Sequence, residues 1–266
     1  MKLDFSVPIS AYELLALIMS GLALAVPIIR FAWKKWITKA KIDFLLAGNA
    51  KLFFNQSGSY MQIDGVITSE NKASTIRKMS INIKRKKDEK KLNLTWKRLI
   101  SPVNQNLVGN YLLTTENAHP IRILEDNVVC VFAQYGDPFD SFEKKFISNT
   151  EDLFKAVSVL VRQFALYDDA ILQYKALPAY SEARNMMQSE FFWEIGKYEL
   201  EIDIEYDNVS KKKYTYAFSV SEHEYQELSK NFDESLISPL KSAYRQQWDY
   251  RSPSIELIKQ EVKTNE

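Results

Sequence analysis

The stretch KYELEIDIEY, residues 197–206, alternates apolar and acidic side chains along its whole length. Its apolar positions are Tyr198, Leu200, Ile202, Ile204 and Tyr206, and its acidic positions are Glu199, Glu201, Asp203 and Glu205. Residues 211–220, KKKYTYAFSV, alternate in the same way after a polar connection at 207–210. Since successive side chains of a strand point to opposite faces, the two stretches predict an antiparallel hairpin with one buried and one solvated face.

The segments on either side of this hairpin have a helical period instead. Upstream, apolar residues recur at Leu153, Val157, Leu160 and Phe164, which predicts an amphipathic helix from about 150 to about 174. A weaker helical stretch follows at 181–190. Downstream, Ser221 and Glu224 have the spacing of a capping box and predict the start of a further helix.

Earlier in the chain, short period-2 runs predict more strands. These runs are 42–47, 51–55, 59–69, 75–85, 92–96, 120–124 and 128–135, and a polar surface excursion is expected at 101–118. The patterns predict a mainly β, sandwich-like soluble domain over 42–250, with inserted helices at about 150–190 and a C-terminal helix. We expect the polar tail at 251–266 to be frayed.

The run Glu194-Ile195-Gly196-Lys197-Tyr198-Glu199-Leu200 resembles the corner that enters strand F of immunoglobulin-like and fibronectin-like β-sandwiches, which reads acid-x-Gly-x-Tyr-x-Cys. Glu194 takes the acidic position, and Leu200 stands where many of those domains carry a cysteine. The resemblance is confined to this corner. It implies that the hairpin supplies strands F and G, that strands before residue 135 supply the rest, and that the helices at 150–190 are inserted before the corner.

The N-terminal part carries a strongly apolar segment. Residues 9–29 contain one ionisable group, Glu13, and a helix of 21 residues is roughly 31 Å long, which is enough to cross a bilayer. We therefore expect a short tail at 1–8, a single transmembrane helix at 9–29 and a basic juxtamembrane segment at 30–41. A cleaved signal peptide and a buried core helix are the alternatives.

Flanking charge predicts the orientation of this helix. Arg30, Lys34, Lys35, Lys39 and Lys41 follow the span, whereas the preceding tail holds one base and one acid. The positive-inside rule then places the N-terminus outside and the soluble domain in the cytoplasm of a cell with a single-pass anchor. The single cysteine, Cys130, agrees with a reducing compartment, and we expect it to pack as a small hydrophobe.

Composition excludes several classes of function. A net charge of +1 argues against a nucleic-acid binder, and one cysteine excludes an intrachain disulfide framework. With two His, seven Gly and no catalytic motif, we predict no catalytic residue, metal site or cofactor. The charge is unevenly divided, because residues 1–100 hold 18 bases and 7 acids while residues 101–266 hold 17 bases and 27 acids.

Two charged sets are candidate binding surfaces. The acidic hairpin face, Glu199, Glu201, Asp203 and Glu205, is a solvated sheet surface, a cation site or a face for a basic partner. A basic set is a solvated turn, a contact to anionic lipid, or a nucleic-acid or nucleotide contact. Its members are Lys34, Lys35, Lys39, Lys41, Lys84, Arg85, Lys86, Lys87, Lys90 and Lys91.

The sequence therefore favours a membrane-tethered, non-enzymatic recognition or scaffolding module that faces the cytoplasm and has a protein partner. One alternative is a membrane-anchored hydrolase or nuclease that uses carboxylates and a divalent cation, drawing on Glu199 to Glu205 or on Asp137 and Asp140. The other alternative is an extracytoplasmic adhesion-type domain, which requires the opposite orientation.

Overall fold

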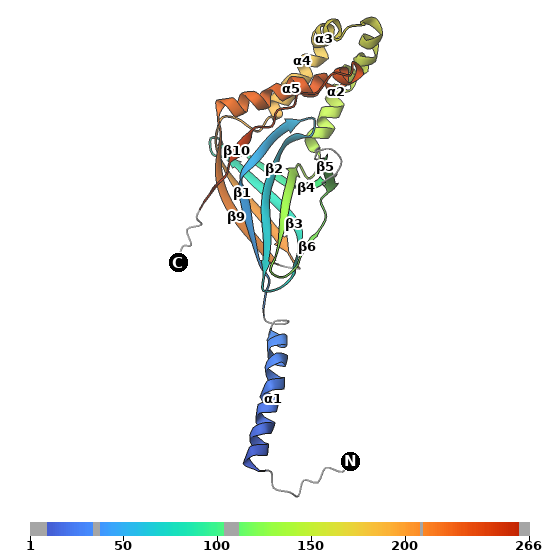
Figure 1. The fold of residues 1–266 in the computed structure, drawn as a ribbon. Coiled ribbons are helices and arrows are strands. Elements are labelled where there is room, and N and C mark those ends of the chain that lie inside the picture. Colours follow the sequence, from blue (N-terminus) through green and yellow to red (C-terminus); the bar gives the residue numbers. More distant parts are fainter. Residues whose placement is uncertain (1–9, 34–37, 104–111, 208–209, 261–266) are drawn as a thin grey trace.

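The computed structural model describes residues 10–33, 38–103, 112–207 and 210–260 (Figure 1). The helices are α1 (Ala11–Ala32), α2 (Ser141–Gln163), α3 (Tyr167–Lys175), α4 (Pro178–Glu190) and α5 (Glu222–Ala243). The strands are β1 (Lys41–Asn55), β2 (Gly58–Glu70), β3 (Ser74–Arg85), β4 (Lys91–Val103), β5 (Leu112–Asn117), β6 (Ile121–Ile123), β7 (Asn127–Gly136), β8 (Gly196–Tyr206), β9 (Ser210–Val220), β10 (Ser254–Glu256) and β11 (Ile258–Lys259).

The strands form one antiparallel sheet of 11 strands in the order β10-β1-β2-β7-β4-β3-β8-β9-β11, with β5 beside β4 and β6 beside β3. The sheet curls until its outer long strands, β1 and β9, face each other, and we call the line between them the seam (Figure 1). An antiparallel sheet domain with several helices, next to one apolar N-terminal helix, therefore agrees with the sequence.

The interior of the curled sheet is filled by the apolar faces of its strands. Ile63, Ile81 and Ile202 are fully buried, and the alternation seen in the sequence decides which side chains point inward. Aromatic side chains fill the end that the helices cover, where the ring of Phe54 lies 5.0 Å from that of Phe191 and 5.2 Å from that of Phe232. The interior is therefore a packed core.

The helices divide between the two ends of the curled sheet. Figure 1 shows α2 to α5 together at one end, which we call the distal end, and α1 leading away from the other. We call that other end the proximal end, because β1 begins there at Lys41. No residue of α1 is buried against the described chain, so α1 adds nothing to the core.

Several boundaries differ from the sequence prediction. The helix expected from 150 begins at Ser141 and ends at Gln163, because Phe164 has an extended backbone, and α3 follows separately. β1 is one strand of 15 residues with a bulge between Leu46 and Ala50, where two strands and a turn were predicted. In the predicted surface excursion at 101–118, β5 pairs with the end of β4, while 104–111 lie outside the described residues.

The tail expected to be frayed is part of the sheet. β10 pairs with Asn49 to Lys51 of β1, and β11 pairs with Tyr216 and Ala217 of β9. This segment, residues 253–260, therefore bridges the distal half of the seam, and we call it the strap. The sequence pattern missed it because its two strands are only three and two residues long, so their alternation, with Ile255 and Leu257 buried, is too short to predict a strand.

The described strands do not form the two separately bonded sheets that the immunoglobulin-like resemblance implies, since they all belong to one sheet. The structure does show the local corner. The hydroxyl of Tyr198 donates to the carbonyl oxygen of Glu194 at 2.6 Å, as the tyrosine of such a corner bonds back to the preceding backbone. The chain therefore has the local hydrogen bond of that corner, while its described strands form one sheet.

Candidate functional site

The acidic hairpin face points outward from β8 and lies between two strands that carry lysines. The carboxylate of Glu201 is 2.8 Å from Lys213 Nζ, and that of Glu205 is 3.0 Å from Lys211 Nζ, both on β9. On the β3 side, Asp203 accepts a hydrogen bond of 3.0 Å from the side-chain amide of Asn82. Glu199 lies 3.9 Å from Lys86 Nζ.

This pairing decides the chemistry of the face. The hydrogen bond from Lys211 lowers the pKa of Glu205 below its usual value, so the carboxylate is held charged by a lysine of its own chain. Within the described ranges, no group of three or more His, Cys, Asp or Glu side chains is placed to hold a metal ion. The four carboxylates form a charge-balanced outer surface of the sheet and do not converge on a common point.

The basic set divides between the two ends of the molecule. Lys39 and Lys41 lie at the proximal end, where Lys41 Nζ is 2.7 Å from the carboxylate of Glu70, and Lys34 and Lys35 lie outside the described residues. The others, from Lys84 to Lys91, form the turn between β3 and β4 at the distal end. A strand as long as β3, with its 12 residues, spans roughly 40 Å. The two groups do not form one patch.

Arg85 is the organising residue of the distal turn, and its side chain is only 2% exposed. Its guanidinium donates to both carboxylate oxygens of Asp88, at 2.8 and 2.6 Å, and to the carbonyl oxygen of Phe192 at 3.1 Å. The bidentate hydrogen bond lowers the pKa of Asp88 to about 2. Arg85 is therefore a structural cation, not a free member of the basic set, and only the position of Asp88 three residues later signals this in the sequence.

A surface cavity of about 460 Å³ opens at the distal end because β7 stops before its two neighbours. Its last residue, Gly136, pairs with Thr95, whereas β4 extends four residues further, to Lys91, and β2 extends to Gly58. The space left between β2 and β4 is lined by Ser57, Gly58, Ser59, Lys90, Lys91, Leu92, Asn93, Asp137, Ser141, Phe142, Lys145, Glu190 and Phe192. We call it the β7-end cavity. Of its lining, the sequence singled out only Lys90 and Lys91 as binding residues and named Asp137 in the hydrolase alternative.

A second cavity of about 250 Å³ adjoins it and includes Asp137 and Asp140, the acids of the hydrolase alternative. Both are already engaged. Asp137 accepts the backbone N–H groups of Phe139 and Ser141 at 3.0 and 2.6 Å, and these bonds outweigh burial and lower its pKa. Asp140 lies 3.0 Å from Lys97 Nζ. The two carboxylates hold the start of α2 in place.

The proximal half of the seam is closed by side chains. Lys212 of β9 donates to the carbonyl oxygen of Ile42 at 2.7 Å and to the carboxylate of Asp43 at 3.0 Å. The hydroxyl of Tyr214 donates to the same carboxylate at 3.1 Å and accepts the backbone N–H of Phe44 at 2.8 Å. Burial opposes ionisation of Asp43, but the bonds from Lys212 and Tyr214 outweigh it and lower its pKa.

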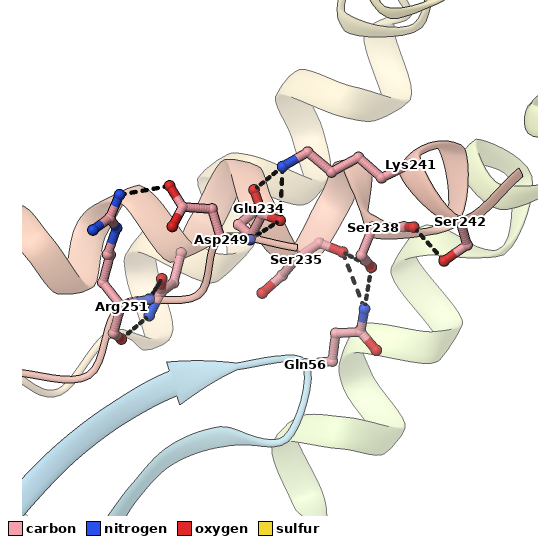
Figure 2. A network of polar contacts seen from close by, with 9 residues as sticks. Gln56, Glu234, Ser235, Ser238, Lys241, Ser242, Asp249 and Arg251 are labelled. Atoms are coloured by element: carbon pink, nitrogen blue, oxygen red, sulfur yellow. Dashed lines mark hydrogen bonds and ion pairs between the residues drawn. The ribbon is translucent and has the colours of Figure 1, made fainter. Parts of the chain in front are cut away.

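The distal half of the seam depends on the polar face of α5, shown in Figure 2. Glu234 of α5 binds Lys241 Nζ at 2.7 Å and accepts the backbone N–H of Asp249 at 2.7 Å. Asn231 exchanges two hydrogen bonds with the backbone of Arg251. These contacts hold the chain that leads into the strap.

The two histidines and the single cysteine of the chain lie apart from one another. His119 lies beside Ala118 and Pro120 at a small cavity near the start of β6, and His223 is in the first turn of α5. Cys130, expected to pack as a hydrophobe, is exposed because its neighbour Val131 is the residue that points inward from β7. The described structure does not combine the three into one site.

No family model and no curated protein sequence matches the chain. Among solved structures, it is similar to a family 123 glycoside hydrolase from Clostridium perfringens, with a TM-score of 0.30 and 8% identity over 69% of this chain and 27% of that one. It is also similar to Spo0M, a sporulation control protein from Bacillus subtilis, with a TM-score of 0.26 and 11% identity over 70% of this chain and 51% of that one. Likeness at this level carries no argument about function.

Proposed function

We propose that α1 anchors the protein in a membrane as a single span and that the curled-sheet domain is a cytoplasmic recognition module. The observation that carries this proposal is the complete exposure of α1. Its most apolar 18-residue stretch has a mean hydropathy of 2.2, and no residue of the helix is buried in the described structure. Since soluble proteins rarely leave so large an apolar surface in water, a bilayer is the natural cover.

The surroundings of α1 support the same proposal. A helix of this length spans roughly 33 Å, and Ser10 and Glu13 form a capping box that satisfies its first backbone N–H groups. A core helix would pack against the sheet, which α1 does not. Basic residues of the juxtamembrane segment favour the cytoplasmic side for the domain that follows.

Recognition, rather than catalysis, is favoured by the state of the acidic residues. The carboxylates of the hairpin face and those at the start of α2 are occupied by lysines or by backbone N–H groups of their own chain. The distal end instead offers an open cavity and lies away from α1 (Figure 1). A domain held in this way presents its distal end to soluble partners.

Membrane anchoring is tested by extraction of the membrane fraction with alkaline carbonate. We expect the full chain to stay in the pellet and a Leu17→Arg, Leu22→Arg variant to be released, because each arginine at the centre of a span costs about 3 kcal/mol. The matched control replaces the same two residues by isoleucine and should stay in the pellet. Release of the unmodified chain would contradict the anchor.

Orientation is tested with Cys130, which is exposed and is the only cysteine of the chain. A membrane-impermeant maleimide should label it only after the cells are permeabilised. A Cys130→Ser, Ser6→Cys variant moves the thiol to the N-terminal tail and should be labelled in intact cells. The reverse pattern would support the extracytoplasmic alternative, and Cys130→Ser alone gives the background.

A further inference from the structure

Two of the lysines that line the β7-end cavity are without an acid partner. Lys145 of the lining pairs with Glu190, and in the adjoining turn Lys84 pairs with Glu89, but Lys90 and Lys91 have no ion pair within the described part of the chain. Lys91 also lies directly opposite Lys84 in the β3–β4 register. Like charges in that position repel each other, so an anion near Lys91 would be stabilising.

The acids that line the same cavity are already held by other groups of the chain. The carboxylate of Asp137 accepts the N–H groups of Phe139 and Ser141 at the start of α2, and the carboxylate of Glu190 is paired with Lys145. The lining holds three lysines, Lys90, Lys91 and Lys145, against the carboxylates of Asp137 and Glu190, so it keeps a net charge of 3 − 2 = +1.

One buried neutral donor of the cavity is also without an acceptor among the described residues. The hydroxyl of Ser59 is buried and has no hydrogen-bond partner among the described residues. Leaving a buried hydroxyl unsatisfied costs free energy, which a ligand with an acceptor oxygen would recover. The side-chain amide of Asn93, on the same strand as Lys91, adds a further donor at the exposed rim.

We propose that the β7-end cavity binds a small soluble anion that carries phosphate, through Lys90, Lys91 and Ser59. The site offers four donor groups: two ammonium groups, a hydroxyl and an amide. These are more donors than the two oxygens of a carboxylate can use, but they match the acceptor oxygens of a phosphate. Phe142 and Phe192 leave room for an apolar part of the same molecule. A volume of about 460 Å³ is within the range of small-ligand sites.

The source of the phosphate is argued from position. The cavity lies at the distal end, while α1 leaves from the proximal end, so a phosphate on a lipid of the anchoring bilayer is roughly a strand length away. The preference for a soluble ligand over a lipid rests on the proposed anchoring. The proposal that the cavity binds phosphate does not rest on the anchoring, because binding is measured whatever the orientation of the protein in a membrane.

The test uses the full chain in phosphatidylcholine nanodiscs, titrated calorimetrically with sodium pyrophosphate against sodium chloride of equal ionic strength. We expect one saturable site in the unmodified protein. A Lys90→Ser, Lys91→Ser variant should bind at least about tenfold more weakly, because it loses two charge-assisted contacts. The matched control is Lys87→Ser, which removes an exposed lysine of the same turn that does not line the cavity. It should change the dissociation constant less than about twofold.

The Ser59→Ala variant distinguishes binding at a specific site from general attraction of the anion by positive charge. It should raise the melting temperature of the unliganded protein, because it removes an unsatisfied hydroxyl, and yet weaken pyrophosphate binding. Three results would overturn the proposal: no saturable binding, equal losses in Lys87→Ser and the double variant, or binding unchanged in the double variant. If the protein bound phosphatidylserine vesicles but not pyrophosphate, the proposal that the ligand is soluble would be overturned.

Discussion

Strand β9 belongs to two regions: the hairpin wall, which we define as β8 and β9 with the neighbouring β3, and the seam between β9 and β1. The two regions are held together by different means. On one edge, β9 pairs with β8 over 11 consecutive residue pairs, and β8 pairs with β3 over nine. On the other edge, two pairs join β9 to β11, three join β1 to β10, and side chains of Asp43, Lys212 and Tyr214 close the rest. The wall is therefore secured by its backbone ladder and apolar face, whereas the seam depends on a few polar contacts.

This difference predicts that the wall unfolds only with the whole domain and that the seam opens locally. Regions with few apolar contacts and short ladders open at lower free energy than core strands. Variants in the two regions should separate these modes, because hydrogen exchange resolves individual amides and denaturation reports the global free energy of unfolding.

The largest effect is expected in the wall, from Ile202→Ala. Ile202 is fully buried, and the loss of its side chain leaves a cavity that costs about 2 to 5 kcal/mol in the global free energy of unfolding. Denaturant titration followed by tryptophan fluorescence measures it, with Trp193 buried in the same core. The neighbouring Glu201→Ser faces outward and should cost less than about 1 kcal/mol. Equal losses in both would show that the wall is not held by its apolar face.

The next effect is expected at the strap, from Lys241→Met. The variant leaves the carboxylate of Glu234, whose side chain is 8% exposed, without its cation. An unpaired charge in such a position lowers the free energy of unfolding by about 2 to 4 kcal/mol. The exchange of the Leu257 amide, which donates to the carbonyl oxygen of Gly48, should accelerate more than the exchange of amides in β8. Lys230→Met breaks an exposed pair on the same helix and is the control. Uniform acceleration throughout the sheet would show that wall and strap form one cooperative unit.

The same contrast explains what the sequence could predict. The two strands of the hairpin, β8 and β9, were predicted to within one residue, because a ladder between neighbouring strands leaves period-2 alternation in both of them. The strap was predicted as a frayed tail, since its partners are more than 30 residues away at Ala217 and more than 200 away at Ala50. One continuous sheet, rather than a sandwich, likewise follows from distant pairings, of β2 and β4 with β7 and of β3 with β8, which single-sequence periodicity does not contain.

The candidate site shows the same limit. Lys90 and Lys91 were recognised as basic residues, but their separation from Lys39 and Lys41 depends on the direction of β3 and β4. The acidic face was recognised as a face, but its neutralising lysines come from a register that places Lys213 beside Glu201. Ser59 carried no signal, because its lack of a partner arises from where β7 ends.

A smaller effect is expected in the proximal half of the seam, from Tyr214→Phe. The variant removes a hydroxyl that donates to Asp43 and accepts from Phe44, and we expect a loss of about 1 to 2 kcal/mol, measured by the exchange of the Phe44 amide. Tyr216→Phe is the matched control on the same strand, because the structure shows no hydrogen bond from its hydroxyl within the described residues. Similar losses in both variants would contradict a specific role for the Tyr214 hydroxyl.

The smallest effect is expected from the charge of Asp43, through pH. Its pKa is lowered in the folded protein by Lys212 and Tyr214, despite the opposing effect of burial. Its contribution is therefore present above the unfolded value of about 4 and is lost as the pH falls through the folded value. The carboxylate is 43% exposed, so solvent screening limits the contribution to less than about 1 kcal/mol. The free energy of unfolding is compared between the unmodified chain and Asp43→Asn at each pH, so that the titration of the other carboxylates cancels. This difference should narrow from pH 7 to pH 3. A difference that stays constant would show that Asp43 closes the seam as a neutral hydrogen-bond acceptor and not as a charge.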